Sequence, residues 1–202
     1  MKKTPTQQRS RQTVETLIEA TARTIVERGW TNTTTNHIAS RAGVGVGSLY
    51  QYFESREALL AALAEREIER LTTRLDAAAP SLMGADPLTG VRTVLEIAFD
   101  HFEQDRALFT ELANHWTATR STAFVDAFEA YVLDSLRLFV TQRYADFEPI
   151  DLNTLAFILS NGTMFTISRF FSRNPRGVTK ESLIEHITTL YALFFASKLR
   201  RT

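Results

Sequence analysis

Apolar residues recur at intervals of three and four positions along almost the whole chain, and this spacing restricts the fold more than any other feature. Between residues 12 and 28 they form a single stripe, made of Val14, Leu17, Ile18, Ala22, Ile25 and Val26. A stripe with this period indicates an amphipathic helix. Because no strand-like alternation continues for more than a few residues, the pattern predicts an all-α protein.

Helix-start and helix-stop signals divide this pattern into about nine helices. We expect them at about 12–28, 34–42, 46–52, 55–78, 88–104, 106–118, 121–143, 151–172 and 179–199. Gly29 and Gly43 are expected to end the first two, because glycine readily adopts the left-handed backbone that closes many helices. Thr33 or Thr34 is expected to cap the second helix. The run APSLMGADPLTG at 79–90 contains two prolines and two glycines and predicts a connection.

Composition excludes several classes of function. The 202 residues include no cysteine, which excludes a disulfide framework, a thiolate metal site and a catalytic cysteine. The four histidines, at positions 37, 101, 115 and 186, lack the spacing of metal ligands. No nucleophile–base pair and no cofactor-binding loop can be placed. We therefore expect a protein that is not an enzyme and that holds neither a metal nor a cofactor.

The charge and hydropathy pattern favours a cytoplasmic protein. Basic residues at the N-terminus are not followed by an apolar run, so a secretory signal is not expected. Residues 152–171 are long enough to span a membrane, but Asn153, Ser160, Asn161 and Arg169 interrupt them. We expect no membrane segment.

The glycine-rich stretch AGVGVGSLYQYF, residues 42–53, has two possible interpretations. A dinucleotide-binding loop must follow a buried strand, and a phosphate-binding P-loop must end in Gly-Lys-Ser or Gly-Lys-Thr. Here a short capped helix precedes Gly43, and the sequence after Gly47 is Ser-Leu. Two short helices joined by a glycine turn and packed on a longer helix instead form a helix-turn-helix unit. Val44, Leu49 and Phe53 are then expected in its core.

The residues around this stretch closely resemble the DNA-binding signature of the TetR family of bacterial transcription regulators. The resemblance covers about residues 10–62, and the matching positions are Gly29-Trp30, Thr33-Thr34-Thr35, Ile38-Ala39, Ala42-Gly43-Val44, Gly47-Ser48-Leu49-Tyr50, Tyr52-Phe53 and Ser55-Arg56-Glu57. It implies an N-terminal three-helix DNA-binding domain at 1–54, with a flexible basic arm at 1–10. A larger helical effector-binding and dimerisation domain then occupies 55–202. Gly45 and Val46 depart from the family, which often has polar residues there.

The resemblance places the DNA contacts on the second and third helices. Residues 1–60 carry eight basic and five acidic side chains, as a nucleic-acid contact at one end requires. The expected phosphate contacts are Thr34, Thr35, Tyr50, Tyr52 and Arg56, and the expected base contacts are Asn36, Val46, Ser48 and Gln51. Gly47 is expected to let its helix approach a neighbour or the DNA closely. The alternative is that Thr34 only caps and Tyr50 only packs. Lys2, Lys3, Arg9 and Arg11 form either an arm along the DNA or a solvated terminus.

The last two expected helices are apolar on almost every side. Such helices must be buried on every side. A four-helix bundle between two subunits provides that cover, and we expect a homodimer. The alternative is the core of a large monomer. The expected interface residues are Leu155, Phe157, Leu159, Phe165, Leu183, Ile187, Leu190 and Phe194.

Aromatic residues concentrate between positions 88 and 143, with polar groups among them. Apolar walls with a few polar groups are typical of a site for a small apolar or amphipathic effector. The same residues are also typical of an ordinary aromatic core. The pocket candidates are Phe99, Phe102, His115, Trp116, Phe128 and Arg169.

The sequence therefore predicts a DNA-binding transcription regulator of the TetR type. We expect a repressor that binds a near-palindromic double-stranded operator as a dimer and is released by a small-molecule effector. One alternative is an activator or a regulator that responds to no ligand. Another is a helical interaction protein that does not bind DNA.

Overall fold

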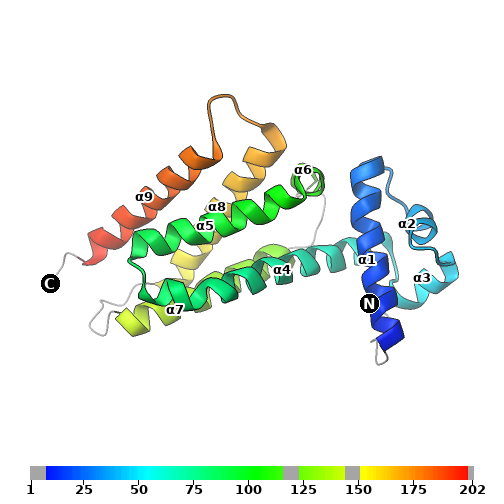
Figure 1. Cartoon of the computed structure of the whole chain (residues 1–202), viewed down its shortest axis with the longest axis horizontal. Coiled ribbons are helices and arrows are strands. Elements are labelled where there is room, and N and C mark those ends of the chain that lie inside the picture. Colours follow the sequence, from blue (N-terminus) through cyan, green and yellow to red (C-terminus); the bar gives the residue numbers. More distant parts are fainter. Residues whose placement is uncertain (1–7, 116–122, 144–150, 200–202) are drawn as a thin grey trace. The chain divides into compact units, whose positions relative to one another are not determined.

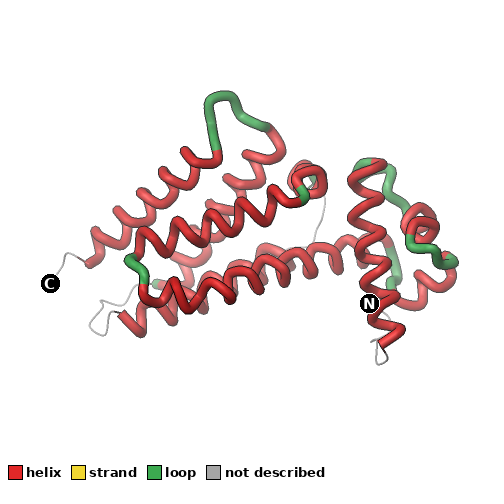
Figure 2. Tube along the Cα trace, in the orientation of Figure 1, coloured by secondary structure: helices red, strands yellow, loops and turns green. Residues whose placement is uncertain are grey.

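The computed structural model describes residues 8–115, 123–143 and 151–199, and within these ranges it contains helices and loops without a strand (Figures 1 and 2). The helices of the described residues are α1 (Gln8–Arg28), α2 (Thr35–Arg41), α3 (Val46–Tyr52), α4 (Arg56–Gly84), α5 (Pro87–Gln104), α6 (Arg106–Asn114), α7 (Ala123–Arg143), α8 (Leu152–Arg173) and α9 (Lys180–Leu199). The expected all-α fold with about nine helices is confirmed. The breaks expected at 119–120 and at 147–151 lie outside the described residues, except for Asp151, which caps α8.

The helices group into two compact units. The first contains α1, α2, α3, α4 as far as Glu67, and α6. The second contains α4 from Ile68 onward, α5, α8, α9 and almost all of α7. The sequence-based domain boundary at residues 54 and 55 therefore differs from the packing, in which part of α4 and all of α6 accompany the first three helices. The functional division at that boundary stays a prediction.

The core of the first unit forms on α1. Leu17 and Ile25 of α1 are fully buried, and buried side chains from α2, α3, α4 and α6 join them, namely Ile38, Leu49, Leu59, Leu63 and Leu108. Burial of one aliphatic side chain of this size contributes about 1.5–3 kcal/mol relative to exposure. The apolar stripe on α1 therefore holds four other helices.

Local chemistry explains where the short helices of this unit begin and end. Gly29 and Gly43 have left-handed φ angles of +78° and +67°, as expected from the sequence. At the start of α2 the Thr34 hydroxyl accepts a hydrogen bond from the His37 backbone N–H at 3.3 Å. Gly45 precedes α3 with an extended backbone and no side-chain hydrogen bond. The cap expected at Thr33 or Thr34 is thus Thr34, and Gly45 occupies the N-cap position of α3.

Four phenylalanines form a cluster inside the second unit. The ring of Phe99 on α5 lies 5.8 Å from that of Phe170 and 6.2 Å from that of Phe171, both on α8. Phe102 lies 6.0 Å from Phe171. All four are buried. The cluster joins α5 to α8 through contacts that only large side chains can make.

A charged contact joins α5 to α9, which lie beside one another (Figure 1). The Lys180 amine at the start of α9 donates hydrogen bonds to Asp100 at 2.6 Å and to Glu103 at 2.8 Å. These bonds, first that to Asp100 and then that to Glu103, raise the pKa of Lys180 above its ordinary value. Lys180 therefore stays charged and fixes the start of α9 against α5.

The connection expected at 79–90 is much shorter in the structure, because α4 continues through Pro80 to Gly84. Proline lacks a backbone N–H and removes one helical hydrogen bond, but it does not have to end a helix when packing continues beyond it. The stripe of Leu71 and Leu75 continues to Leu82, which is half-buried. The second proline, Pro87, begins α5 directly after its cap Asp86.

We expect Phe99→Ala to lower the free energy of unfolding by about 3–5 kcal/mol, because the change leaves a cavity in the aromatic cluster. Leu88→Ala on the same helix is the matched control, since Leu88 is 48% exposed. That control should change stability by less than about 0.5 kcal/mol. Chemical denaturation followed by circular dichroism measures both, and equal stabilities of the two variants would contradict this packing.

Candidate nucleic-acid interface

Residues 42–45 turn the chain between α2 and α3. The Gly43 N–H donates to the Ser40 carbonyl at 3.2 Å, and the Val44 N–H donates to the Ala39 carbonyl at 3.0 Å. A side chain at Gly43 would be strained at its left-handed φ. Leu49, which is fully buried, then anchors α3 in the core. The two helices and their turn form a helix-turn-helix unit supported by α1.

One side of α3 is exposed, and it adjoins the start of α2. Ser48 and Gln51 are exposed, and Tyr50 is 42% exposed. The Tyr50 hydroxyl lies 3.2 Å from the Thr35 hydroxyl of α2, and Asn36 is exposed beside Thr35 in the sequence. Hydroxyl and amide groups of this kind bind phosphate oxygens and base edges. The structure therefore brings together five of the residues that the sequence predicts as DNA contacts.

Four other predicted DNA contacts also interact within the first unit. Val46 and Tyr52 are half-buried and pack against the core, and Thr34 caps α2. The Arg56 guanidinium lies 5.2 Å from the centre of the Trp30 ring and donates a hydrogen bond to the Trp30 carbonyl. Contact of these four residues with DNA stays a prediction.

The predicted basic arm lies mostly outside the described residues, which begin at Gln8. Lys2 and Lys3 therefore have no structural description here. Arg9 and Arg11 are exposed in the first turns of α1. Their role on DNA stays a prediction.

Trp30 joins three elements of the first unit, including a helix that the resemblance assigns to the effector domain. Its backbone N–H donates to the Glu111 carboxylate of α6 at 2.8 Å. Its ring stacks on that of His115, just after α6, at 5.3 Å and nearly parallel. Arg56 contacts it from the start of α4. Sequence reasoning identified Trp30 as part of the family signature but missed Glu111, because nothing in the sequence links residues 81 positions apart.

The predicted effector-pocket residues that the structure describes belong to different units. Phe99, Phe102 and Phe128 are buried in the second unit, whereas His115 stacks on Trp30 in the first. Arg169 on α8 is exposed, and Trp116 lies outside the described residues. The effector pocket stays a prediction.

The predicted dimer-interface residues differ in how exposed their side chains are. Phe157 and Phe165 on α8 and Leu190 on α9 are at least 57% exposed, and Leu155 is buried. Leu159, Leu183, Ile187 and Phe194 are half-buried. Ile158 and Leu193, which are not among the predicted interface residues, are 59% and 63% exposed. We call the five exposed residues Phe157, Ile158, Phe165, Leu190 and Leu193 the α8–α9 apolar surface.

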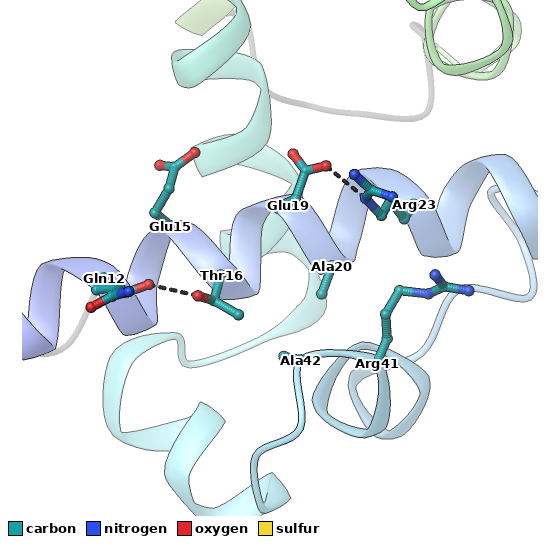
Figure 3. A pocket seen from close by; sticks show the side chains of 8 residues that line it. All are labelled: Gln12, Glu15, Thr16, Glu19, Ala20, Arg23, Arg41 and Ala42. Atoms are coloured by element: carbon teal, nitrogen blue, oxygen red, sulfur yellow. Dashed lines mark hydrogen bonds and ion pairs between the residues drawn. The ribbon is translucent and has the colours of Figure 1, made fainter.

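A hollow of about 380 Å³ lies beside α1 and the end of α2 (Figure 3). Its lining residues are Gln12, Glu15, Thr16, Glu19, Ala20, Arg23, Arg41 and Ala42. Glu19 accepts a hydrogen bond from Arg23 at 2.7 Å. This bond and the charge of Arg66 lower the pKa of Glu19 below its ordinary value, so the carboxylate stays ionised.

Two features are absent from the described part of the chain. No helix there combines the length and the apolar composition needed to cross a membrane. No three histidine, cysteine, aspartate or glutamate residues of that part of the chain come together as metal ligands would.

The chain is similar to bacterial regulators of transcription. The family model described as bacterial regulatory proteins, tetR family, matches residues 17–63. The transcriptional repressor KstR of Rhodococcus jostii strain RHA1 is 29% identical over 174 residues, which cover 84% of this chain and 77% of KstR. The transcriptional regulator EthR of Mycolicibacterium smegmatis is 35% identical over 89 residues, which cover 44% of this chain and 41% of EthR.

Among solved structures, a TetR-like transcriptional regulator from Rhodococcus sp. RHA1 has the same fold. It matches with a TM-score of 0.63 at 19% sequence identity, over 92% of this chain and 97% of that one. The family match begins at Leu17 and ends at Leu63, both core residues of the first unit. The family match and these relatives identify a DNA-binding regulator of transcription. Residues 17–63 match the TetR family of bacterial regulatory proteins, and most of the chain is similar to one of its repressors.

The substitution Gly47→Ala tests whether α3 must approach DNA closely, because it should change DNA affinity without lowering the stability of the protein. An added Cβ meets no atom within 4 Å, and alanine favours a helix over glycine by up to about 1 kcal/mol. The protein should therefore be at least as stable as the wild type. Affinity for operator DNA should nevertheless fall about tenfold, equivalent to about 1.4 kcal/mol, because the methyl group keeps the α3 backbone away from the DNA.

The matched control for this test is Gly90→Ala on α5, where an added Cβ also meets open space. It should leave affinity unchanged. Thermal unfolding and fluorescence anisotropy with labelled operator measure the two properties. Unchanged affinity of Gly47→Ala would show that this glycine is not needed for close approach.

Proposed function

We propose that this regulator binds a near-palindromic operator in double-stranded DNA as a homodimer and represses transcription until a small molecule releases it. The exposed polar face of α2 and α3 carries the proposal, since the hydroxyls of Thr35 and Tyr50 meet there beside Ser48 and Gln51. A helix of this kind enters the major groove of DNA. Operator DNA lies in the bacterial cytoplasm, which is where the proposed activity takes place.

Two kinds of contact are assigned on this face. Phosphates are held by the hydroxyls of Thr35 and Tyr50, with Thr34, Tyr52 and Arg56 at the edges. Base edges meet Ser48 and Gln51 on α3, together with Asn36 and Val46. The Gln51 amide has the donor and acceptor that pair with adenine, and the Val46 methyl groups suit the methyl group of thymine.

The proposed dimer is supported by the α8–α9 apolar surface. Its members Phe157, Phe165 and Leu190 are 57%, 68% and 64% exposed. Burial of apolar area at about 25 cal/mol per Å² favours covering such side chains. Tyr191 of α9 donates to the Leu159 carbonyl of α8 at 3.1 Å and also contacts Thr163. The two helices are thus already joined and can pack as one face against a second copy.

A dimer also meets the needs of DNA recognition. One α3 helix contacts only a few bases, whereas two recognition helices about 34–36 Å apart contact two half-sites on one face of the duplex. A two-fold dimer then requires a near-palindromic operator.

Repression is inferred from KstR, which is a transcriptional repressor. Release requires a small molecule that binds one arrangement of the helices better than another, because only a difference in affinity can shift an equilibrium. A melting-temperature screen with small apolar and amphipathic compounds tests this part. A compound that raises the melting temperature and lowers operator affinity supports release, and a regulator insensitive to all compounds would argue for ligand-independent binding.

Tyr50→Ala tests the DNA-binding face. We expect affinity for DNA upstream of the protein's own gene to fall about tenfold, because the loss of a phosphate contact and of packing costs about 1–2 kcal/mol. Tyr131→Phe in the second unit is the control and should bind like the wild type. Mobility-shift assays over a range of salt concentrations measure both. If Tyr50→Ala is folded and binds with unchanged affinity, the assigned role of Tyr50 is wrong.

Phe165→Glu combined with Leu190→Glu tests the dimer. Two carboxylates in an apolar interface would be desolvated without partners, so we expect a monomer at micromolar concentration and a loss of tight operator binding. Leu88→Glu on α5 places a carboxylate at another exposed apolar position and should remain dimeric. Sedimentation velocity distinguishes the outcomes, and a wild-type monomer would refute the proposed dimer.

A further inference from the structure

Arg74 of α4 brings a positive charge into the second unit without a partner for it. Its side chain is half-buried, and its Nη1 atom is inaccessible to solvent and has no hydrogen-bond partner in the described part of the chain. Arg66, earlier on the same helix, is buried too but donates to three carboxylates, those of Glu15, Glu19 and Glu67. A charged nitrogen that leaves water without an acceptor destabilises a folded chain. Nη1 of Arg74 is therefore available to an acceptor from outside the described residues.

Asp76, the acidic residue nearest to Arg74 in the sequence, does not supply this acceptor. It follows Arg74 by two positions, which corresponds to about 200° around a helix, so the two side chains leave α4 on different sides. The Asp76 carboxylate accepts a hydrogen bond from the Tyr131 hydroxyl of α7 at 3.0 Å. Burial, and after it this bond, raises the pKa of Tyr131 to about 12, so the hydroxyl stays protonated at neutral pH. Asp76 is therefore bonded to α7 and leaves Arg74 without a counter-charge.

The residues one helical turn away from Arg74 lie on the same side of α4. After it come Ala77 and Ala78, whose side chains are single methyl groups. Before it come Arg70, which is a second guanidinium, and Leu71, which is fully buried. Two like charges one turn apart destabilise a helix, and an anion near them offsets their repulsion. This side of α4 therefore combines positive charge with short or buried apolar side chains.

We infer that Arg74 binds the anionic head group of the small molecule that releases the regulator from DNA, and that this head group is a carboxylate or a phosphate on an apolar body. A planar guanidinium matches both head groups with paired hydrogen bonds. Because Leu71 and Leu75, on either side of Arg74 in α4, are buried, the molecule has to be apolar next to its head group. The inference rests on the proposed release by a small molecule and adds the charge that this molecule carries.

Three probes that share one apolar chain test the inference. They are decanoate, decyl phosphate and the neutral decanol, each used below its micellar concentration and measured with the full chain by isothermal titration calorimetry. We expect at least one of the two anions to bind the wild type about tenfold more tightly than decanol, because a hydrogen bond to a charged group stabilises a complex by at least that factor. The anion that binds more tightly identifies the head group.

Arg74→Gln removes the charge and keeps a polar side chain. It should lower the affinity for the preferred anion about tenfold, to the level of decanol, and leave the affinity for decanol unchanged. Because Nη1 of Arg74 has no partner among the residues described, the melting temperature without a probe should not fall. Arg92→Gln removes the same charge from an exposed position of α5 and should bind all three probes like the wild type.

Equal affinity of Arg74→Gln and the wild type for both anions overturns the inference, and so does a wild type that binds decanol as tightly as the anions. A lower melting temperature of Arg74→Gln without a probe also overturns it, because Arg74 would then have a stabilising partner within the chain. Fluorescence anisotropy with labelled operator separates these results from the proposed function. An anion that binds through Arg74 but leaves the operator bound supports the binding site and contradicts the proposed release. Release by decanol alone supports the proposed release and overturns the role of Arg74.

Discussion

The burial of one apolar stripe on α1 is the constraint on which the first unit depends. Leu17 and Ile25 are completely inaccessible, and every other helix of the unit contributes a buried side chain to the same core. Because α2 and α3 are only seven residues long, neither is stable alone in water. Their exposed polar face therefore exists only while α1 supports them, and mutations in this stripe would remove DNA binding by unfolding the site.

Local signals in the sequence were sufficient to predict the helix-turn-helix. The left-handed glycines and the Thr34 cap act within a few residues, so their effects can be derived from neighbouring positions. The contacts of Trp30 with Glu111 and of Arg66 with Glu15 join residues 81 and 51 positions apart. No periodicity encodes such pairs. Pro80 shows the opposite error. Its helix-breaking tendency predicted a connection, but the packing of α4 continues beyond it and the helix does not end there.

The second unit shows a different limit of sequence reasoning. Apolar residues on all sides of α8 predicted a helix that is buried on every side, whereas in the single chain Phe157 and Phe165 of α8 are exposed. They did not show which residue lies on which side. Leu155 is 5% exposed and Phe157 is 57% exposed, because two positions correspond to about 200° around a helix. Only the neighbours, α5 among them, decide which of these residues becomes core.

The hydroxyl pair of Thr35 and Tyr50 also bears on the entropy of association. A tyrosine free in solution samples several rotamers, and the loss of that freedom on binding costs about 0.5–1.5 kcal/mol per side chain. Here the ring is already oriented by its 3.2 Å contact with a neighbouring helix. A phosphate that meets both oxygens finds them ordered beforehand. The proposed DNA-binding surface of α2 and α3 is in this respect preorganised, because the side-chain freedom is lost when the chain folds and not when DNA binds.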